Sequence, residues 1–324
     1  MFLGIDGGGT KTAFALVDAR GAVLARHEES SAYYIEVGMD GAAAMLARGC
    51  AAVFAAAGIG PGDLAFAFFG LPAYGEDRAA QAQLDALPRA ILGHERYLCG
   101  NDMVCSWSGS LACADGISVI AGTGSMAYGE YAGRKARAGG WGELFSDEGS
   151  AHWIARAGLA LFSRMSDGRA PRGPLYALVR SRLALQEDLD LCGVVYGDLK
   201  AERSRIAVLA RLVTEAAAQG DGLAQAIVDR AAAELVDMVD AVRAGLDVPA
   251  AATVAVSYTG GLFGPEGPLR APFARSLAAR ARPCRLQEPL LDPSLGAALY
   301  AARGNGTPLD AAALARLSGA RRTT

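Results

Sequence analysis

Two stretches of the chain decide its fold, and the first reads FLGIDGGGTKTAFALV over residues 2–17. A short apolar run meets Asp6 and a glycine-rich turn, and a second run rich in apolar residues follows from Thr12. Residues 18–21 are a hairpin signal, and residues 22–25 begin the return. We therefore expect the chain to open with a strand, a turn, a strand, a turn and a strand.

The opening pattern returns as ISVIAGTGSMAYGEY over residues 117–131, with residues 135–138 as the third strand. After each copy, periodic apolar residues and glycine stops predict alternating helices and strands. The predicted helices cover residues 39–57, 76–87, 102–113, 150–165, 174–185, 204–219, 223–244, 269–282 and 294–303, and the further strands cover 64–69, 96–99 and 253–257. A sheet with helices that occurs twice predicts an α/β protein of two similar domains with a cleft between them.

Composition narrows the class of protein. A length of 324 residues suggests about two domains, and 31 basic against 34 acidic residues argues against general nucleic-acid binding. No apolar run approaches the roughly 18 residues of a membrane helix, and residues 1–5 lack the basic flank of a signal peptide. These features predict a cytoplasmic protein that binds neither nucleic acid nor membrane.

The six cysteines form no CxxC pair, and the three histidines are isolated. A structural zinc site is therefore not expected, and buried free thiols in a reducing compartment are.

The first glycine turn, residues 6–12, has the composition of an anion site. Its three glycines let the backbone approach an anion closely, while Thr10 adds a hydroxyl and Lys11 a charge. Asp6, at a strand end, could hold a hydrated Mg²⁺, which prefers one or two carboxylates plus water and phosphate oxygens. The turn is neither a P-loop nor a dinucleotide fingerprint. The alternative is a hairpin turn without a ligand.

The second glycine turn, Gly122-Thr123-Gly124-Ser125, occupies the equivalent position in the second copy of the pattern. Two such turns across a cleft would make a pair of phosphate-binding loops. A third turn, TGGLF over residues 259–263, could let an adenosine lie against the backbone.

Gly100-Asn101-Asp102 lies where a predicted strand ends and a helix begins. Asp102 could be an N-cap residue. Alternatively, its carboxylate could take a proton from a substrate hydroxyl and orient it as a nucleophile.

A dense loop, GGWGELFSDEGS, covers residues 139–150. Asp147, Glu148 and Ser150 could bond sugar hydroxyls, and Trp141 could offer an apolar platform. The alternatives are helix capping by Asp147 or Ser150 and a core position for Trp141.

In this order, DGGGTKT, GND, GTGS, GGWG…SDEGSA, TGGLF and PSLGAA (residues 293–298) resemble the motifs of the BadF/BadG/BcrA/BcrD ATPase family. That family belongs to the actin-like, sugar-kinase and Hsp70 superfamily, and the resemblance is to its N-acetylglucosamine kinases. It spans residues 1–303.

The resemblance implies an α/β fold of two ribonuclease-H-like domains with mixed sheets, flanking helices and a nucleotide cleft between them. The N-terminal domain would cover residues 1–118, joined by the helix near 294–303, and the C-terminal domain 119–293. Residues 304–324 would form a peripheral tail.

The resemblance also implies roles for single residues in binding ATP, Mg²⁺ and a sugar. Asp102 would be the general base and Asp6 would organise Mg²⁺ through water. The phosphate loops would contain Gly8, Gly9, Thr10 and Lys11 in the first and Thr123 and Gly124 in the second, with Gly260 and Gly261 beside the adenosine. The sugar would lie near Asn101, Trp141, Gly142, Asp147 and Ser150.

The function implied is transfer of the γ-phosphate of Mg·ATP to an amino sugar, at the 6-hydroxyl of N-acetylglucosamine or glucosamine, by a possible homodimer. Kinases of this family usually carry an asparagine in an early sugar-binding loop, and here residues 30–34 read SSAYY. The alternative is therefore a nucleotide-dependent switch or sensor of the same family without sugar chemistry. The helices over residues 174–244 carry no chemical signal, and Asp188, Asp190 and Asp198 are expected to be solvated or capping residues.

Overall fold

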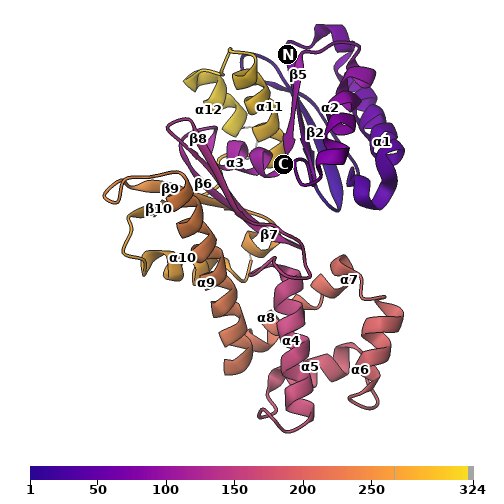
Figure 1. Ribbon diagram of the computed structural model, residues 1–324, viewed down its shortest axis with the longest axis vertical. Helices are drawn as coiled ribbons and strands as arrows, with labels where there is room; N and C mark the ends of the chain where they lie inside the picture. Colours follow the sequence, from indigo (N-terminus) through magenta and orange to yellow (C-terminus); the bar gives the residue numbers. More distant parts are fainter. Residues whose placement is uncertain (266, 320–324) are drawn as a thin grey trace. The chain divides into compact units, whose positions relative to one another are not determined.

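The structure, a computed structural model, describes residues 1–265 and 267–319. It separates into two compact units (Figure 1): unit 1 is Met1–Gly116 with Glu288–Thr324, and unit 2 is Ile117–Gln287. Each unit has its own five-stranded sheet and its own buried core. The predicted α/β class, with two domains that each hold a mixed sheet, is confirmed.

The sheet of unit 1 has the order β3-β2-β1-β4-β5. Its strands are β1 (Phe2–Gly7), β2 (Lys11–Val17), β3 (Val23–Ser30), β4 (Phe66–Leu71) and β5 (Tyr97–Asn101). The first three strands pair antiparallel, as the hairpin signals predict, whereas β4 and β5 run parallel to β1. Because parallel strands end at the same edge, the carboxyl ends of β1, β4 and β5 lie side by side.

Helices and short 3-10 turns complete unit 1: α1 (Tyr34–Ala57), η1 (Pro61–Asp63), α2 (Arg78–Leu92), α3 (Met103–Leu111), α11 (Pro293–Gly304) and α12 (Ala311–Gly319). Helix α1 is interrupted at Gly38, whose φ is 75° and ψ 164°, so its regular part begins at Met39, as predicted.

With 24 residues, α1 is also the one helix in the described part of the chain that is long and apolar enough to cross a membrane. The prediction that no apolar run approaches this length is therefore wrong for α1. Met45, Leu46 and Val53 of α1 are buried in the core of unit 1, so packing within the unit accounts for much of this apolar character.

Helix α11 packs onto β1 and α3 at glycines on all three elements. A Cβ at Gly296 would lie 2.2 Å from the backbone nitrogen of Gly109, and one at Gly4 would lie 2.1 Å from that of Ala298. The segment expected as a peripheral tail from residue 304 contains α12, whose Leu317 is fully buried against the same part of the core. The C-terminal segment therefore completes the core of unit 1.

The sheet of unit 2 has the order β10-β9-β6-β7-β8. Its strands are β6 (Gly116–Ala121), β7 (Ser125–Tyr131), β8 (Arg134–Gly139), β9 (Val254–Thr259) and β10 (Cys284–Leu286). Strands β6, β9 and β10 are parallel and β7 pairs antiparallel with β8. This strand order repeats that of unit 1, as the recurring sequence pattern predicts.

The helical elements of unit 2 are α4 (Ala151–Ser166), α5 (Pro174–Arg182), α6 (Asp190–Cys192), a π-helical turn η2 (Gly193–Asp198), α7 (Arg203–Ala207), α8 (Ala210–Ala218), α9 (Gly222–Gly245), η3 (Gly261–Phe263) and α10 (Arg270–Ala278). The helix predicted over residues 204–219 is thus divided into α7 and α8.

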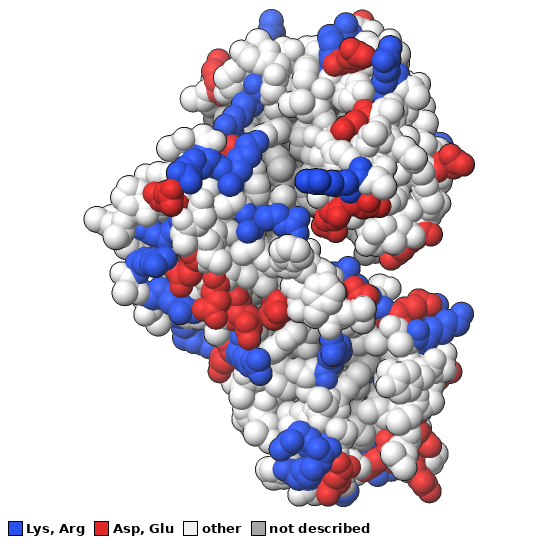
Figure 2. All heavy atoms as spheres, viewed as in Figure 1, with Lys and Arg blue, Asp and Glu red and all other residues white. Residues whose placement is uncertain are grey.

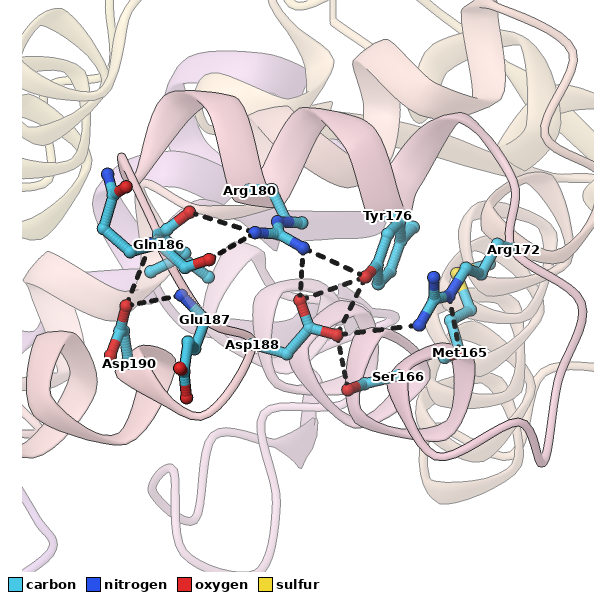
Figure 3. Close-up of polar contacts among 10 residues, drawn as sticks. Met165, Ser166, Arg172, Tyr176, Arg180, Gln186, Glu187, Asp188 and Asp190 are labelled. Atoms are coloured by element: carbon cyan, nitrogen blue, oxygen red, sulfur yellow. Dashed lines mark hydrogen bonds and ion pairs between the residues drawn. The ribbon is translucent and has the colours of Figure 1, made fainter.

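A polar cluster around Asp188 joins the end of α4 to α5 and to the loop that follows α5 (Figure 3). Its carboxylate accepts hydrogen bonds from Ser166 at 2.7 Å and Tyr176 at 2.8 Å and pairs with Arg180 at 3.2 Å. The bond from Ser166 is the largest cause that holds the pKa of Asp188 below its usual value. The prediction that Asp188 is a solvated or capping residue is therefore wrong. The prediction holds for Asp190, whose side chain accepts from two backbone N–H groups of the preceding loop.

All six cysteines are free, as predicted, but only Cys50 and Cys105 are buried, whereas three others are half-buried and Cys192 is exposed. Figure 2 shows Lys and Arg side chains interspersed with Asp and Glu over the face in view, in keeping with the near balance of 31 basic and 34 acidic residues.

Gly296→Ala should destabilise the protein, because its Cβ would meet backbone atoms of α3 that a side-chain rotation cannot move away. We expect a loss of at least about 2 kcal/mol in the free energy of unfolding, within the usual range for overpacking. Gly222→Ala is the matched control, because a Cβ there meets nothing within 4 Å. Urea unfolding measures both variants, and equal stability of the two would contradict the packing described.

Candidate functional site

Two carboxylates lie at the carboxyl edge of the parallel strands in unit 1. Asp6 is next to last in β1 and pairs in register with Gly70 of β4, while Asp102 directly follows β5. Gly70 lies between them: a Cβ there would come within 3.4 Å of the Cα of Asp102 and 2.1 Å of the sulfur of Cys105. Glycine at position 70 therefore leaves room for the thiol of Cys105 beside Asp102.

Asp102 occupies the N-cap position of α3, yet its side chain makes no capping hydrogen bond. The preceding residue supplies that bond instead, since Oδ1 of Asn101 accepts from the backbone N–H of Met103 at 3.1 Å. The Asn101 amide also donates to the carbonyl of Tyr74 at 3.2 Å. The capping interpretation of Asp102 is therefore wrong, and both ends of the Asn101 side chain are engaged within unit 1.

Burial disturbs the ionisation of both carboxylates. Burial, followed by the negative charge of Asp6, raises the pKa of Asp102 to about 8. Burial also raises the pKa of Asp6 to about 7, against the opposing effect of a hydrogen bond with Cys105. Burial and both carboxylates raise the pKa of the Cys105 thiol well above its usual value. Such a pair favours either a bound proton or a nearby cation.

The first glycine turn joins β1 to β2 at the same edge. The backbone N–H of Gly8 donates to the carbonyl of Lys11 at 2.8 Å, and the hydroxyl of Ser31 donates to the carbonyl of Gly8 at 2.9 Å. A Cβ at Gly9 would meet nothing within 4 Å. The Lys11 ammonium pairs with exposed Glu28 at 2.6 Å. The protein's own packing thus gives no reason for glycine at position 9.

The second glycine turn, in unit 2, is tied to the start of α4. The N–H groups of Ala151 and His152 donate to the carbonyls of Gly122 and Thr123 at 2.9 and 3.3 Å. Ser150 is the N-cap of α4, and its buried hydroxyl accepts from the N–H of Trp153 at 3.1 Å. The capping interpretation of Ser150 is therefore confirmed.

The loop over residues 139–150 exposes its aromatic side chain. Gly139, Gly140 and Gly142 have φ values of 72°, 70° and 100°, which favour glycine. Trp141 is 69% exposed, with the guanidinium of Arg137 5.7 Å above its ring, so the core interpretation of this tryptophan is wrong. A cavity of about 390 Å³ opens beside it, lined also by Phe145, Ser146 and Glu148 of the loop and by α9.

Asp147 differs from Trp141 in being only 2% exposed, at a φ of 62°. Its Oδ2 lies 2.5 Å from Nη2 of Arg203, and its Oδ1 lies 3.4 Å from the N–H of Ser125. Arg203 belongs to α7, in the segment without a chemical signal. This contact could not be predicted from the sequence, because Arg203 lies 56 positions from the residue that it contacts and its neighbours form no recognisable motif.

The third turn lies where β9 ends, beside the second. Gly260 has a φ of 100°, and a Cβ on it would lie 2.3 Å from the carbonyl oxygen of Ala121. Gly261 faces open space, and the hydroxyl oxygen of Thr259 is buried without a hydrogen-bond partner in the part of the chain that the structure describes. Because β6 and β9 are parallel neighbours, both turns lie at the carboxyl edge of one sheet.

The predicted residues thus fall into two groups. Unit 1 brings together Asp6, Asn101, Asp102 and the first glycine turn, and unit 2 brings together the second and third turns and the loop over residues 139–150. Among the described residues no group of three His, Cys, Asp or Glu could hold a metal ion. Two neighbouring carboxylates fit a hydrated Mg²⁺, which binds few protein ligands.

Asp102→Asn should stabilise the protein increasingly as the pH rises. Asp102 has an ordinary pKa of 3.8 when unfolded and about 8 when folded, so between these values only the folded state retains the proton. The stability of the wild type therefore falls across this window, and the amide cannot titrate. Melting temperatures at several pH values, without divalent cations, measure the difference.

The matched control is Asp77→Asn at the N-cap of α2, where Asp77 accepts from the N–H of Ala79. Asparagine caps equally well, so little change is expected. A gap between Asp102→Asn and the wild type that stays constant with pH would contradict the raised pKa.

Comparison with known proteins shows the family to which this chain belongs. Residues 3–301 match the BadF/BadG/BcrA/BcrD ATPase family. The chain is 30% identical over 310 residues to the N-acetyl-D-glucosamine kinase of Dictyostelium discoideum, an alignment that covers 93% of this chain and 97% of that one. Over 44% of the chain and 46% of the relative, it is 35% identical to an N-acetylmuramic acid/N-acetylglucosamine kinase of Clostridium acetobutylicum.

Solved structures agree. A structure from Chromobacterium violaceum, assigned as an N-acetylglucosamine kinase, superposes with a TM-score of 0.73 at 26% identity, covering 92% of this chain and 98% of that one. A glucokinase of the ROK family from Streptomyces griseus shares the fold at a TM-score of 0.53 and 17% identity, covering 92% of this chain. With its actin-like fold, the chain belongs to the BadF/BadG/BcrA/BcrD ATPase family and is N-acetylglucosamine kinase-like.

Proposed function

We propose that this protein is an ATP-dependent amino-sugar kinase, which transfers the γ-phosphate of ATP to the 6-hydroxyl of N-acetylglucosamine or glucosamine. Its 30% identity to a curated N-acetyl-D-glucosamine kinase over 93% of the chain supports the class of reaction. The observation that carries the proposal is the carboxylate of Asp102, which has no capping role and whose pKa is raised to about 8.

In this proposal Asp102 is the general base. A carboxylate with a pKa near the working pH accepts a proton effectively, whereas an ordinary exposed aspartate is a weaker base. Asp102 takes the proton of the sugar hydroxyl while that oxygen bonds to the γ-phosphorus, and the bond from phosphorus to the β–γ bridging oxygen of ATP breaks to release ADP. Positioning and neutralisation of charge supply most of the rate in such reactions.

The glycine turns are the proposed ATP site. Gly8, Gly9, Thr10 and Lys11 of the first turn, with Thr123 and Gly124 of the second, would contact the phosphates, and Gly260 and Gly261 the adenosine. This assignment is supported by the open space beside Gly9 and Gly261 and by the hydroxyl of Thr259, which has no hydrogen-bond partner among the residues that the structure describes. Mg²⁺, held through water by Asp6, would neutralise phosphate charge and the repulsion between Asp6 and Asp102.

The sugar is the least constrained part of the proposal. Asn101, Asp147 and Ser150 each bond to other protein groups, whereas Gly142 and exposed Trp141 leave the loop open beside a cavity. The choice between N-acetylglucosamine and glucosamine and the proposal of a homodimer rest on the family resemblance, whereas the cytoplasmic location rests on the composition of the chain.

A nucleotide-dependent switch is the second candidate. The stretch Ser30–Tyr34 lacks the family's usual asparagine, and the hydroxyl of Ser31 there bonds to the first glycine turn. A switch would bind ATP without being stimulated by a sugar.

The first test measures ADP release from Mg·ATP with N-acetylglucosamine, glucosamine, N-acetylmuramic acid, N-acetylmannosamine and glucose. We expect stimulation by one of the first two. Asp102→Asn should then lower kcat by about 10²- to 10⁴-fold, the usual share of a general base, with ATP binding retained in calorimetry. Asp77→Asn should keep wild-type turnover. Turnover retained by Asp102→Asn would remove the base role, and ATP binding without any stimulation by sugar would favour the switch.

A second test separates glycines that contact the ligand from those that maintain the fold. Gly9→Ala should weaken ATP binding by roughly tenfold, equal to about 1.4 kcal/mol, without lowering the melting temperature. Gly260→Ala should lower the melting temperature, because its φ is positive and its Cβ would meet the backbone of Ala121. Gly62→Ala, with nothing within 4 Å, is the control for both. Unchanged ATP affinity in Gly9→Ala would contradict the first phosphate loop.

A further inference from the structure

Arg203 reaches the proposed site from a helix that has no role in the chemistry described so far. It is the first residue of α7, and its Nη2 lies 2.5 Å from Oδ2 of Asp147. Its Nε is 3.8 Å from Oε2 of Glu143 and has no hydrogen-bond partner among the described residues. The guanidinium therefore forms an ion pair with Asp147, near the end of the loop over residues 139–150. A second carboxylate of that loop, on Glu143, lies nearby.

The same guanidinium determines what fits in the second glycine turn. A Cβ at Gly124 would lie 2.0 Å from Nη2 of Arg203 and 3.1 Å from Oδ2 of Asp147. A side chain at position 124 would therefore push the guanidinium away from Asp147, so the ion pair itself favours glycine there, apart from any ligand. The N–H of Ser125 in that turn points to the other oxygen of Asp147 at 3.4 Å. Arg203, Asp147 and the turn form one packed assembly.

Electrostatics make this assembly dependent on the arginine. Asp147 is 2% exposed, whereas the Arg203 side chain is 34% exposed. Removing the cation that pairs with a buried carboxylate leaves that charge uncompensated, which is strongly unfavourable unless the side chain turns toward water. The backbone of Asp147 has a φ of 62°, in the left-handed region that aspartate adopts more readily than most non-glycine residues. Without Arg203, the Asp147 side chain would lose its ion pair, although the hydroxyl of Ser125 would still bond to the carbonyl of Glu148 at 2.6 Å.

We propose that Arg203 is a positioning residue for the sugar site, which holds the charged carboxylate of Asp147 in the orientation that binds the sugar. The inference rests on the proposed function, because it takes Asp147 as a sugar contact. Arg203 itself transfers no proton and contacts no reacting atom. Its planar guanidinium suits a carboxylate better than the point charge of a lysine does.

The test compares Arg203→Met and Arg203→Lys with Arg205→Met, in full-length protein and with the sugar that stimulates the wild type. Arg205 lies on the same short helix but pairs with Glu202 at its surface, so it is a matched control. We expect Arg203→Met to raise the KM for the sugar by roughly tenfold or more, with kcat and the KM for ATP changed less than about threefold. Arg203→Lys should give an intermediate KM, and Arg205→Met the wild-type value.

A double mutant separates positioning from a general loss of structure. If Arg203 acts through Asp147, then Asp147→Asn combined with Arg203→Met should bind the sugar no worse than Asp147→Asn alone. Additive losses, or an Arg203→Met enzyme that matches Arg205→Met, would overturn the inference. If Arg203→Met does not fold, Arg203→Lys decides: a raised KM for the sugar supports the role and an unchanged KM removes it. Absence of stimulation of the wild type by any sugar would remove the proposed function, and this inference with it.

Discussion

The strongest constraint on unit 1 is that it buries two carboxylates at one edge of its sheet. Parallel β1, β4 and β5 bring Asp6 and Asp102 to the same edge, and Gly70 leaves room there for the thiol of Cys105. Protein folding alone would not favour two such acids, since burial raises both pKa values, and the charge of Asp6 raises that of Asp102 further. A site that costs stability in the free protein is one that a cation or a proton transfer can use.

Much of this arrangement could be predicted from the sequence, because it is local or repeated. The two glycine turns, the strands around them and the recurrence at residue 117 follow from apolar runs that end in glycine. The role of Asp102 could not be decided in that way, since an aspartate before a helix is usually a cap. The structure excludes the capping role, because the preceding residue, Asn101, makes the capping bond instead.

The contact between Arg203 and Asp147 could not be predicted, because it depends on how α7 packs and has no pattern in the sequence. The sequence also does not show why glycine occupies a given position. Gly9 and Gly124 look alike as letters in glycine-rich turns, yet position 9 faces open space and position 124 faces a guanidinium. Likewise, the burial of Leu317 in α12 follows from tertiary packing and not from the composition of the tail.

The packing of α11 on β1 and α3 has a consequence for synthesis of the chain. Unit 2 is continuous, from Ile117 to Gln287, so it can fold as soon as it leaves the ribosome. Unit 1 begins first but needs residues 293–304 to cover β1 at Gly4. Unit 1, which contains Asp6 and Asp102, would therefore be the last to reach its native state. Until then, the apolar sheet face that α11 covers would stay accessible to chaperones.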